Sequence, residues 1–151
     1  MIEEKLKELG IVIPEPPKPL AVYIPAIRDD KYVFTAGQIP LKNGQLIYKG
    51  RVGKDLTLET GMKAAELCAL NCLAAIKSVV ENLDQIERFL KVTVFVNSAD
   101  GFTDQPKVAN GASELLGKIF GDNGRHVRSA VGVSELPIDS AVEVEMIVKV
   151  K

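Results

Sequence analysis

The sequence contains no tryptophan, and aromatic residues make up only 5% of its 151 positions. Proteins that bind single-stranded nucleic acid without reading its sequence stack the bases on aromatic side chains. The chain also lacks a basic excess, since 19 lysines and arginines face 20 acidic residues and the formal net charge is −1. A nucleic-acid-binding surface usually shows such an excess. We therefore expect no nucleic-acid partner.

Long apolar runs are missing as well. No stretch reaches the roughly 18 apolar residues that a membrane-spanning helix needs. The first ten residues, MIEEKLKELG, are charged and follow a helical pattern, unlike a signal peptide. We expect no membrane partner and a cytoplasmic location.

Metal-binding and nucleophilic side chains are scarce. Cys68 and Cys72 lie four residues apart, on one face of a predicted helix. A zinc site would need two more ligands, and the single histidine, His126, is far away in the sequence. Packing in the core is the favoured role of both cysteines over metal or redox chemistry. The chain also lacks the GxxxxGK(S/T), GxGxxG and GxSxG motifs. We expect no metal and no organic cofactor.

The length and the 46% apolar content are typical of one globular domain with a substantial core. Residues 2–9 have the pattern of a short helix that ends at Gly10. Four prolines between Pro14 and Pro19 then favour an extended tether. We divide the chain into a helix and proline-rich tether at residues 1–18 and a domain at residues 19–151.

The domain shows alternating strand patterns and two long helical patterns. Thr57 is a plausible N-cap of the first helix, Asn43-Gly44 predicts a hairpin turn, and Pro25 favours an edge or bulged strand. The last two strands are interpreted as an antiparallel hairpin joined by ELPIDS. The predicted strands cover residues 20–28, 31–35, 45–48, 88–97, 127–134 and 141–150. The predicted helices cover residues 57–83 and 103–120.

This order predicts an α+β fold, a two-layer sandwich of a six-stranded mixed sheet with two helices on one face. The other face would be uncovered. Several strand residues are too apolar to face water, whichever of the two sheet faces they lie on. Burial of both faces therefore requires a partner, and we predict a homo-oligomer. These residues are Tyr23, Phe34, Val94, Val96, Val131 and Val133.

The segment GRHVRSAVGVSELP, residues 124–137, combines an apolar alternation typical of a buried strand with unusual positive charge. Arg128 shares a strand face with Ala130 and Gly132, whose small side chains leave room for a ligand. An arginine binds a carboxylate through two parallel hydrogen bonds. Arg128 is therefore a candidate anion-binding residue.

The last strand carries Glu143 and Glu145, which point away from its apolar side. One interpretation is two solvated surface charges. The other is a carboxylate that positions a water for hydrolysis of the C=N bond of a 2-imino acid bound by Arg128. In the hairpin interpretation position 128 pairs with about position 148, so Glu143 does not reach Arg128 within one chain.

Three blocks resemble the Rid/YjgF family, also labelled L-PSP endoribonuclease or reactive intermediate deaminase. They are YVFTAGQIP at 32–40, KVTVFVNSADGF at 91–102 followed by Asn110 and Glu114, and RSAVGVSELPIDSAVEVEMIV at 128–148. The third block keeps the family spacing between its arginine, its LP turn and its glutamates. The resemblance covers about residues 19–151 and is closest to a side branch with an N-terminal extension.

The resemblance implies a chorismate-mutase-like fold and a homotrimer with three clefts between subunits. The family's carboxylate-binding arginine and water-positioning glutamate fall on Arg128 and Glu143, and its cleft tyrosine and asparagine fall on Tyr23 and Asn110. Two positions depart from the family: the cleft serine is Ala36, and the cysteine found in many members is Ala130, where the family uses backbone groups for substrate contact. The alternative for Tyr23 is packing at an edge, and the alternative for Asn110 is solvation or capping at the start of the second helix. His126 is expected in a turn or at a contact with a neighbouring chain, and the less favoured interpretation is that it lines the cleft beside Arg128.

Three functions follow from the resemblance. The first is hydrolysis of reactive enamines and imines, such as 2-aminoacrylate and 2-iminopropanoate, to the 2-keto acid and ammonia. The second is a binding module that holds a small carboxylate without turnover, which the changes at Ala36 and Ala130 favour. The third is RNA cleavage, against which the charge and the few aromatic residues argue.

Overall fold

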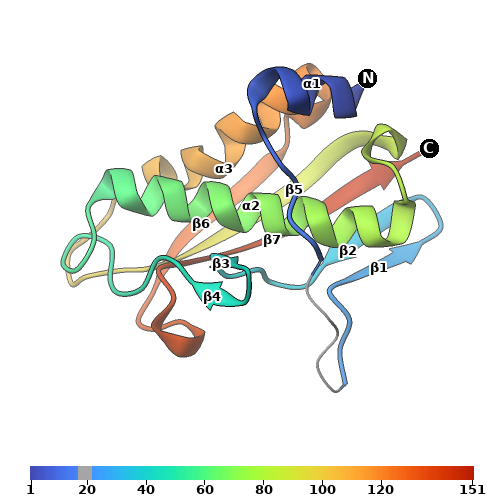
Figure 1. Ribbon diagram of the computed structural model, residues 1–151. Coiled ribbons are helices and arrows are strands. Elements are labelled where there is room, and N and C mark those ends of the chain that lie inside the picture. The colour runs from blue at the N-terminus through green and yellow to red at the C-terminus, as the bar shows by residue number, and fades with distance from the viewer. Residues whose placement is uncertain (17–21) are drawn as a thin grey trace.

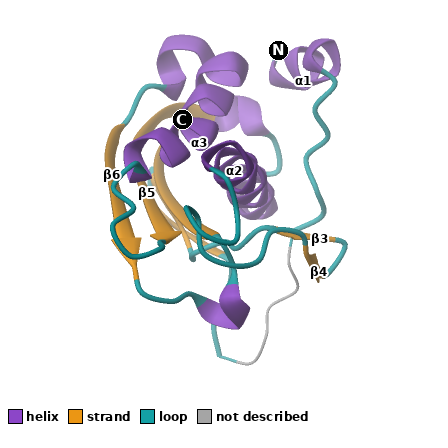
Figure 2. Cartoon of the chain, turned by 90° about the vertical axis from the view of Figure 1, so that its left-hand side faces the viewer, coloured by secondary structure: helices purple, strands orange, loops and turns teal. Residues whose placement is uncertain are grey.

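The computed structural model describes residues 1–16 and 22–151. A mixed sheet of five strands carries two long helices on one face, and the other face is open (Figure 1, Figure 2). This confirms the α+β class and the two-layer arrangement. The domain boundary expected between residues 18 and 19, and the first two positions of the strand expected at 20–28, lie outside the described residues.

The sheet has the strand order β1-β2-β7-β5-β6, and β3 and β4 form a separate hairpin. The expected six-stranded sheet is therefore wrong, because the strand after Asn43-Gly44 pairs only with β3. Three 3₁₀ turns, η1 (Leu83–Gln85), η2 (Gly121–Gly124) and η3 (Pro137–Asp139), connect larger elements. The strands are β1 (Ala26–Asp29), β2 (Tyr32–Thr35), β3 (Leu41–Lys42), β4 (Gln45–Leu46), β5 (Ile86–Asn97), β6 (Val127–Val133) and β7 (Val142–Val150), and the helices are α1 (Ile2–Leu9), α2 (Leu58–Val80) and α3 (Gln105–Phe120).

The expected hairpin between the last two strands is also wrong. β6 runs parallel to β5, and β7 runs antiparallel to β5 on its other side, so β5 separates the two. The reason is the helix between β5 and β6, since a strand–helix–strand crossover brings its two strands side by side and parallel. The chain then crosses the end of β5 through η3, where Ile138 and Asp139 adopt positive φ angles of 50° and 60°.

Strand β6 is an edge of the sheet and not the buried strand that its apolar alternation predicts. Val127 and Val131 are 67% and 44% exposed on the open face. β1 forms the opposite edge and begins directly after Pro25, which confirms the edge position expected there. Within residues 1–16 and 22–151, the sheet therefore has an unpaired strand at each of its two ends.

Helix α2 packs along the covered face of the sheet. It begins as predicted at Thr57, whose hydroxyl accepts the backbone N–H of Thr60 at 3.1 Å. It ends at Val80, three residues before the predicted end, because Glu81 adopts a φ of 66° and the chain turns into η1.

The two cysteines of α2 are fully buried, which confirms their predicted place in the core. The thiols of Cys68 and Cys72 donate to the carbonyls of Val142 and Val144 on β7. Burial raises the pKa of Cys72 to about 12, so this thiol is not a reactive thiolate.

The N-terminal helix is docked to the domain. As predicted, α1 ends at Gly10, which adopts a φ of 68°. Leu6 is buried, the backbone N–H of Ile2 donates to Asp84 at 2.9 Å, and Lys77 of α2 pairs with Glu3 at 3.2 Å. Figure 1 shows α1 beside α3 on the helical side of the molecule.

The open face of the sheet retains an apolar surface. Valines 92, 94 and 96 of β5 lie under the helices and are fully buried, so two of the residues expected on the uncovered face belong to the core. None of the described helices is both long and apolar enough to cross a membrane. The large apolar side chains that stay exposed on the open face are Ile27, Tyr32, Phe34, Val127 and Val131.

Candidate anion-binding site

Arg128 lies on β6 with its side chain on the helical face of the sheet. Its Cα partner on β5 is Val92, a core residue, and its guanidinium contacts α3. Nη1 donates to Oδ1 of Asn110 at 2.9 Å and to Oγ of Ser113 at 3.0 Å, and Nη2 donates to the carbonyl of Pro106 at 3.2 Å. Three neutral acceptors of one helix therefore hold the guanidinium.

The positive charge of Arg128 has no counterion in the described part of the chain, since none of the ion pairs there includes it. A guanidinium has five N–H donors, and α3 occupies three of them. The Nε–H and one N–H of Nη2 remain, and none of the hydrogen bonds of the described residues uses them. The Nε–Nη2 pair of an arginine can bind the two oxygens of a carboxylate.

His126 is half-buried and contacts Ser113 from outside α3. Its Nδ1 is 2.7 Å from the carbonyl of Gly124, and its Nε2 is 2.9 Å from Oγ of Ser113. A carbonyl can only accept, so Nδ1 carries the proton and Nε2 accepts from the serine hydroxyl. Burial lowers the pKa of His126 from 6.5, the Arg128 charge lowers it further, and the Gly124 bond opposes both.

Asn110 and Ala130 share this part of the structure. Asn110 lies in the second turn of α3 and accepts from Arg128, so its side-chain oxygen does not cap the helix. Ala130 pairs with Val94 of β5 and lies on the same strand face as Arg128, half-buried against the core. Three of the six predicted site residues, Arg128, Asn110 and Ala130, are therefore brought together.

Glu143 lies on the opposite face of the sheet. Its Cα partner is Phe95, whose neighbour on β6 is Val131, whereas Arg128 lies in the row of Val92 and Met146. Glu143 and Arg128 therefore do not meet within one chain. Burial raises the pKa of the half-buried Glu143 above its ordinary value, and the nearby Glu145 charge raises it further.

The segment after β2 lies against Glu143. A Cβ atom placed on Gly37 would come within 2.8 Å of Cδ of Glu143, so only glycine leaves room for this carboxyl position. Ala36 precedes this glycine, and its backbone N–H donates to the carbonyl of Pro25 at 2.8 Å. Tyr23 lies in the segment before β1 and is 58% exposed. Glu143 and Ala36 thus form a second group, apart from Arg128.

Three residues near the two groups, Ser113, His126 and Gly37, are not among the six predicted site residues. Ser113 lies one turn after Asn110 on α3, and this spacing places both on one helix face. His126 shares a strand alternation with Arg128, which was the available signal for their proximity. Gly37 adjoins the alanine that replaces the family's serine, and its packing on Glu143 depends on tertiary structure alone.

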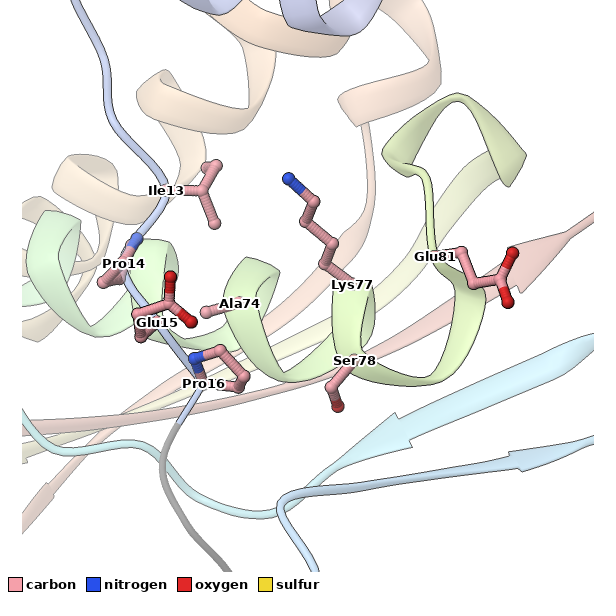
Figure 3. A pocket seen from close by; sticks show the side chains of 8 residues that line it. All are labelled: Ile13, Pro14, Glu15, Pro16, Ala74, Lys77, Ser78 and Glu81. Carbon is pink, nitrogen blue, oxygen red and sulfur yellow. The ribbon is translucent and has the colours of Figure 1, made fainter.

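A cavity of about 270 Å³ lies elsewhere, between residues 13–16 and α2 (Figure 3). Of the lining residues that the structure describes, Lys77 is the cation, and it already pairs with Glu3 at 3.2 Å; none of these residues is a predicted site residue. In residues 1–16 and 22–151, no three His, Cys, Asp or Glu side chains are grouped as a metal site requires. Among the described residues, Arg128 is the arginine best placed to bind an anion.

The fold and this site define a two-layer α+β protein of the chorismate-mutase-like type with an arginine held at one edge of its sheet. The family described as YjgF/chorismate mutase-like, putative endoribonuclease, matches residues 3–150. The chain belongs to this YjgF family, as the three sequence blocks predict.

Individual relatives agree with this assignment. Protein TCP17 of Trypanosoma cruzi is 38% identical over 149 residues, covering 98% of this chain and 93% of that protein. The crystal structure of Atu1372 from Agrobacterium tumefaciens has a TM-score of 0.93 and 38% identity, covering 99% of this chain and 92% of that chain. Escherichia coli TdcF, crystallised with bound serine, has a TM-score of 0.67 and 21% identity over 91% of this chain and 94% of that chain, which is a likeness of fold alone.

Proposed function

We propose that this chain forms homotrimers whose inter-subunit clefts bind 2-imino and 2-enamine acids and hydrolyse them to 2-keto acids and ammonia. The observation that carries the proposal is the guanidinium of Arg128. Three hydrogen bonds fix it, no carboxylate of the described residues neutralises it, and the Nε–H and one N–H of Nη2 remain as donors. A small carboxylate is the ligand that fits these two donors.

The separation of the two residue groups supports a cleft built by two subunits. Arg128 and Asn110 lie at the β6 edge, whereas Ala36 and Tyr23 lie near the β1–β2 edge. A neighbouring copy that packs its β1–β2 edge against β6 would bring the groups together. Burial of the apolar open face, including Phe34 and Val131, would drive this assembly.

The proposed reaction balances without a cofactor. Water adds to the carbon of the C=N bond, the nitrogen takes up a proton, and the resulting amino alcohol loses ammonia as the C–N bond breaks and the C=O bond forms. An enamine first takes a proton at its terminal carbon and becomes the imine. Arg128 would hold the substrate carboxylate throughout.

Glu143 would position the water and exchange protons with it. Its raised pKa suits this role, because a proton-transfer group works best when its pKa approaches the working pH. Its half-buried position also keeps it accessible to water. Ala36 and the backbone at Ala130 would line the substrate pocket without contributing a hydroxyl or a thiol.

A binding module for small carboxylates is the second candidate. The alanines at positions 36 and 130 favour it, since they lack the polar side chains that family members carry there. The bound serine of TdcF is a small carboxylate, which supports a ligand of this size in either case. RNA cleavage, named in the family description, is disfavoured by the net charge of −1 and the 5% aromatic content.

The test generates 2-iminopropanoate in place from alanine and an amino-acid oxidase, with semicarbazide to trap it. We expect wild-type protein to suppress semicarbazone formation and Arg128→Ala to lose at least about 100-fold in kcat/KM, because one partner of a charge-assisted fork is removed. Arg88→Ala, which removes an exposed arginine of β5, is the matched control. Equal suppression by both variants would contradict the proposal, and pyruvate binding without turnover would favour the binding module.

A further inference from the structure

A chain of hydrogen bonds runs from the protein interior to Arg128. The carbonyl of Gly124 accepts from Nδ1 of His126 at 2.7 Å, and Nε2 of His126 accepts from the Ser113 hydroxyl at 2.9 Å. Oγ of Ser113 in turn accepts from Nη1 of Arg128 at 3.0 Å. Each hydrogen bond fixes the direction of the next. Because the hydrogen of the Ser113 hydroxyl is bonded to His126, the lone pairs of Oγ are left to accept from Arg128.

We propose that Ser113 and His126 are positioning residues for Arg128, which they hold with its free edge turned toward the substrate carboxylate. This inference rests on the proposed function of Arg128 as the carboxylate-binding group. Ser113 acts by direct contact. His126 acts through Ser113, because it holds the hydrogen of the serine hydroxyl and so leaves the lone pairs of Oγ directed at the guanidinium. The proposal deepens the function, since it says what prepares the site before a ligand binds.

The hydrogen bonds of Ser113 differ from those that a serine inside a helix usually forms. Serines inside helices commonly bond a carbonyl of their own helix, as Ser78 of α2 does with the carbonyl of Ala75 at 2.6 Å. Ser113 is also inside a helix, but its partners are His126 and Arg128 from outside α3. The hydroxyl is therefore used to join the helix to the two side chains.

The electrostatics of His126 agree with this role. A charged imidazole would carry hydrogens on both nitrogens and could not accept from Ser113. Burial and the Arg128 charge both lower the pKa of His126, so the ring stays neutral near pH 7. Among the charged groups of the neighbouring elements, only Arg128 shifts this pKa, while Glu114 and Lys118 of α3 line the groove that faces α2.

Steady-state kinetics on 2-iminopropanoate provide the first test. Ser113→Ala should raise KM about 5- to 10-fold with kcat nearly unchanged, which is the effect of one lost hydrogen bond on substrate binding. His126→Ala should raise KM less, and His126→Gln should restore it, since the glutamine amide oxygen replaces the Nε2 acceptor. Ser78→Ala is the matched control and should leave KM unchanged. A lower melting temperature with unchanged KM for Ser113→Ala would overturn the proposal.

A double variant tests whether His126 acts through Ser113. In the Ser113→Ala background, His126→Ala should have no further effect on KM. Additive effects of the two substitutions on KM would contradict the proposal that His126 acts through Ser113.

The wild-type protein offers a test that needs no variant. His126 is the only histidine in the sequence, so ¹⁵N NMR of the untagged protein gives one imidazole pair. We expect a neutral ring with its proton on Nδ1 at pH 7. A charged ring, or a neutral ring with its proton on Nε2, would overturn the proposal that His126 acts through Ser113. Wild-type protein without turnover or pyruvate binding would instead contradict the proposed function, which separates the two failures.

Discussion

The two groups of the candidate site differ in how far a single chain completes them. On the β6–α3 side, α3 holds Arg128 through three hydrogen bonds of 2.9 to 3.2 Å. On the β2–β7 side, the side-chain carboxylate of Glu143 accepts no hydrogen bond from the described residues, and it lies against Gly37. One group is therefore set in position by the fold, and the other is left free to bind a proton, a water or a neighbouring chain.

The largest effect expected on the Glu143 side comes from Glu143→Gln. This change should lower kcat about 100-fold and leave pyruvate binding intact, because it removes proton transfer but not the carboxylate fork. Isothermal titration calorimetry and the semicarbazide assay measure the two properties. An unchanged kcat would remove Glu143 from the mechanism.

The pH dependence of turnover distinguishes the two glutamates of β7. The rate should fall as the pH decreases through the pKa of Glu143, because the carboxylate then becomes protonated. Burial raises this pKa, so the fall should occur above the ordinary value of 4.5. Glu145→Gln should shift this fall to lower pH, since the Glu145 charge raises the pKa of Glu143. Glu143→Gln should abolish the pH-dependent fall and also be more stable than wild type at pH 7, where ionisation of Glu143 destabilises the folded state.

Gly37→Ala should have an intermediate effect. The added methyl group would meet the Glu143 carboxyl at 2.8 Å, and the flexible glutamate would move aside while the backbone stays in place. We expect kcat to fall about 10-fold with little change in the melting temperature. Gly117→Ala, where an added Cβ meets nothing within 4 Å, is the control. A kcat for Gly37→Ala equal to that of the control would show that the carboxyl position does not matter.

The smallest effect concerns stability and the Arg128 side. The pKa of His126 is lower in the folded protein than its ordinary 6.5, so the unfolded chain binds more protons between the two values. The free energy of unfolding should therefore decrease as the pH falls through 6.5 toward the folded pKa. Urea titrations should show a smaller decrease in His126→Gln. The same slope in both proteins would place the pH sensitivity elsewhere.

Local patterns predicted the local features well. Asn43 and Gly44 both adopt positive φ angles, 53° and 76°, as their hairpin turn requires. Thr57 caps α2, and Cys68 and Cys72 lie in the core. These features depend on a residue's own conformational preference or on its place in a repeating pattern, and both can be deduced from neighbouring residues.

Strand neighbours and cross-element contacts were not predictable in the same way. The alternation in β6 indicates which residues share a face, but it does not show that β5 lies between β6 and β7. The same limit applies to the site. Arg128 was indicated by its strand face of small residues and by the family resemblance, and Asn110 by the resemblance alone. The contact of Ser113 with His126, in contrast, requires α3 to pack on the end of β6.

Mixed trimers of two inactive variants test the shared cleft most directly. Co-expression of Arg128→Ala with Glu143→Gln in equal amounts would give clefts that combine an intact arginine of one subunit with an intact glutamate of its neighbour. If each cleft is shared, about one quarter of the clefts are complete and about one quarter of wild-type turnover returns. If one chain supplies both residues, or if the protein is monomeric by light scattering, the mixture stays at the level of the single variants.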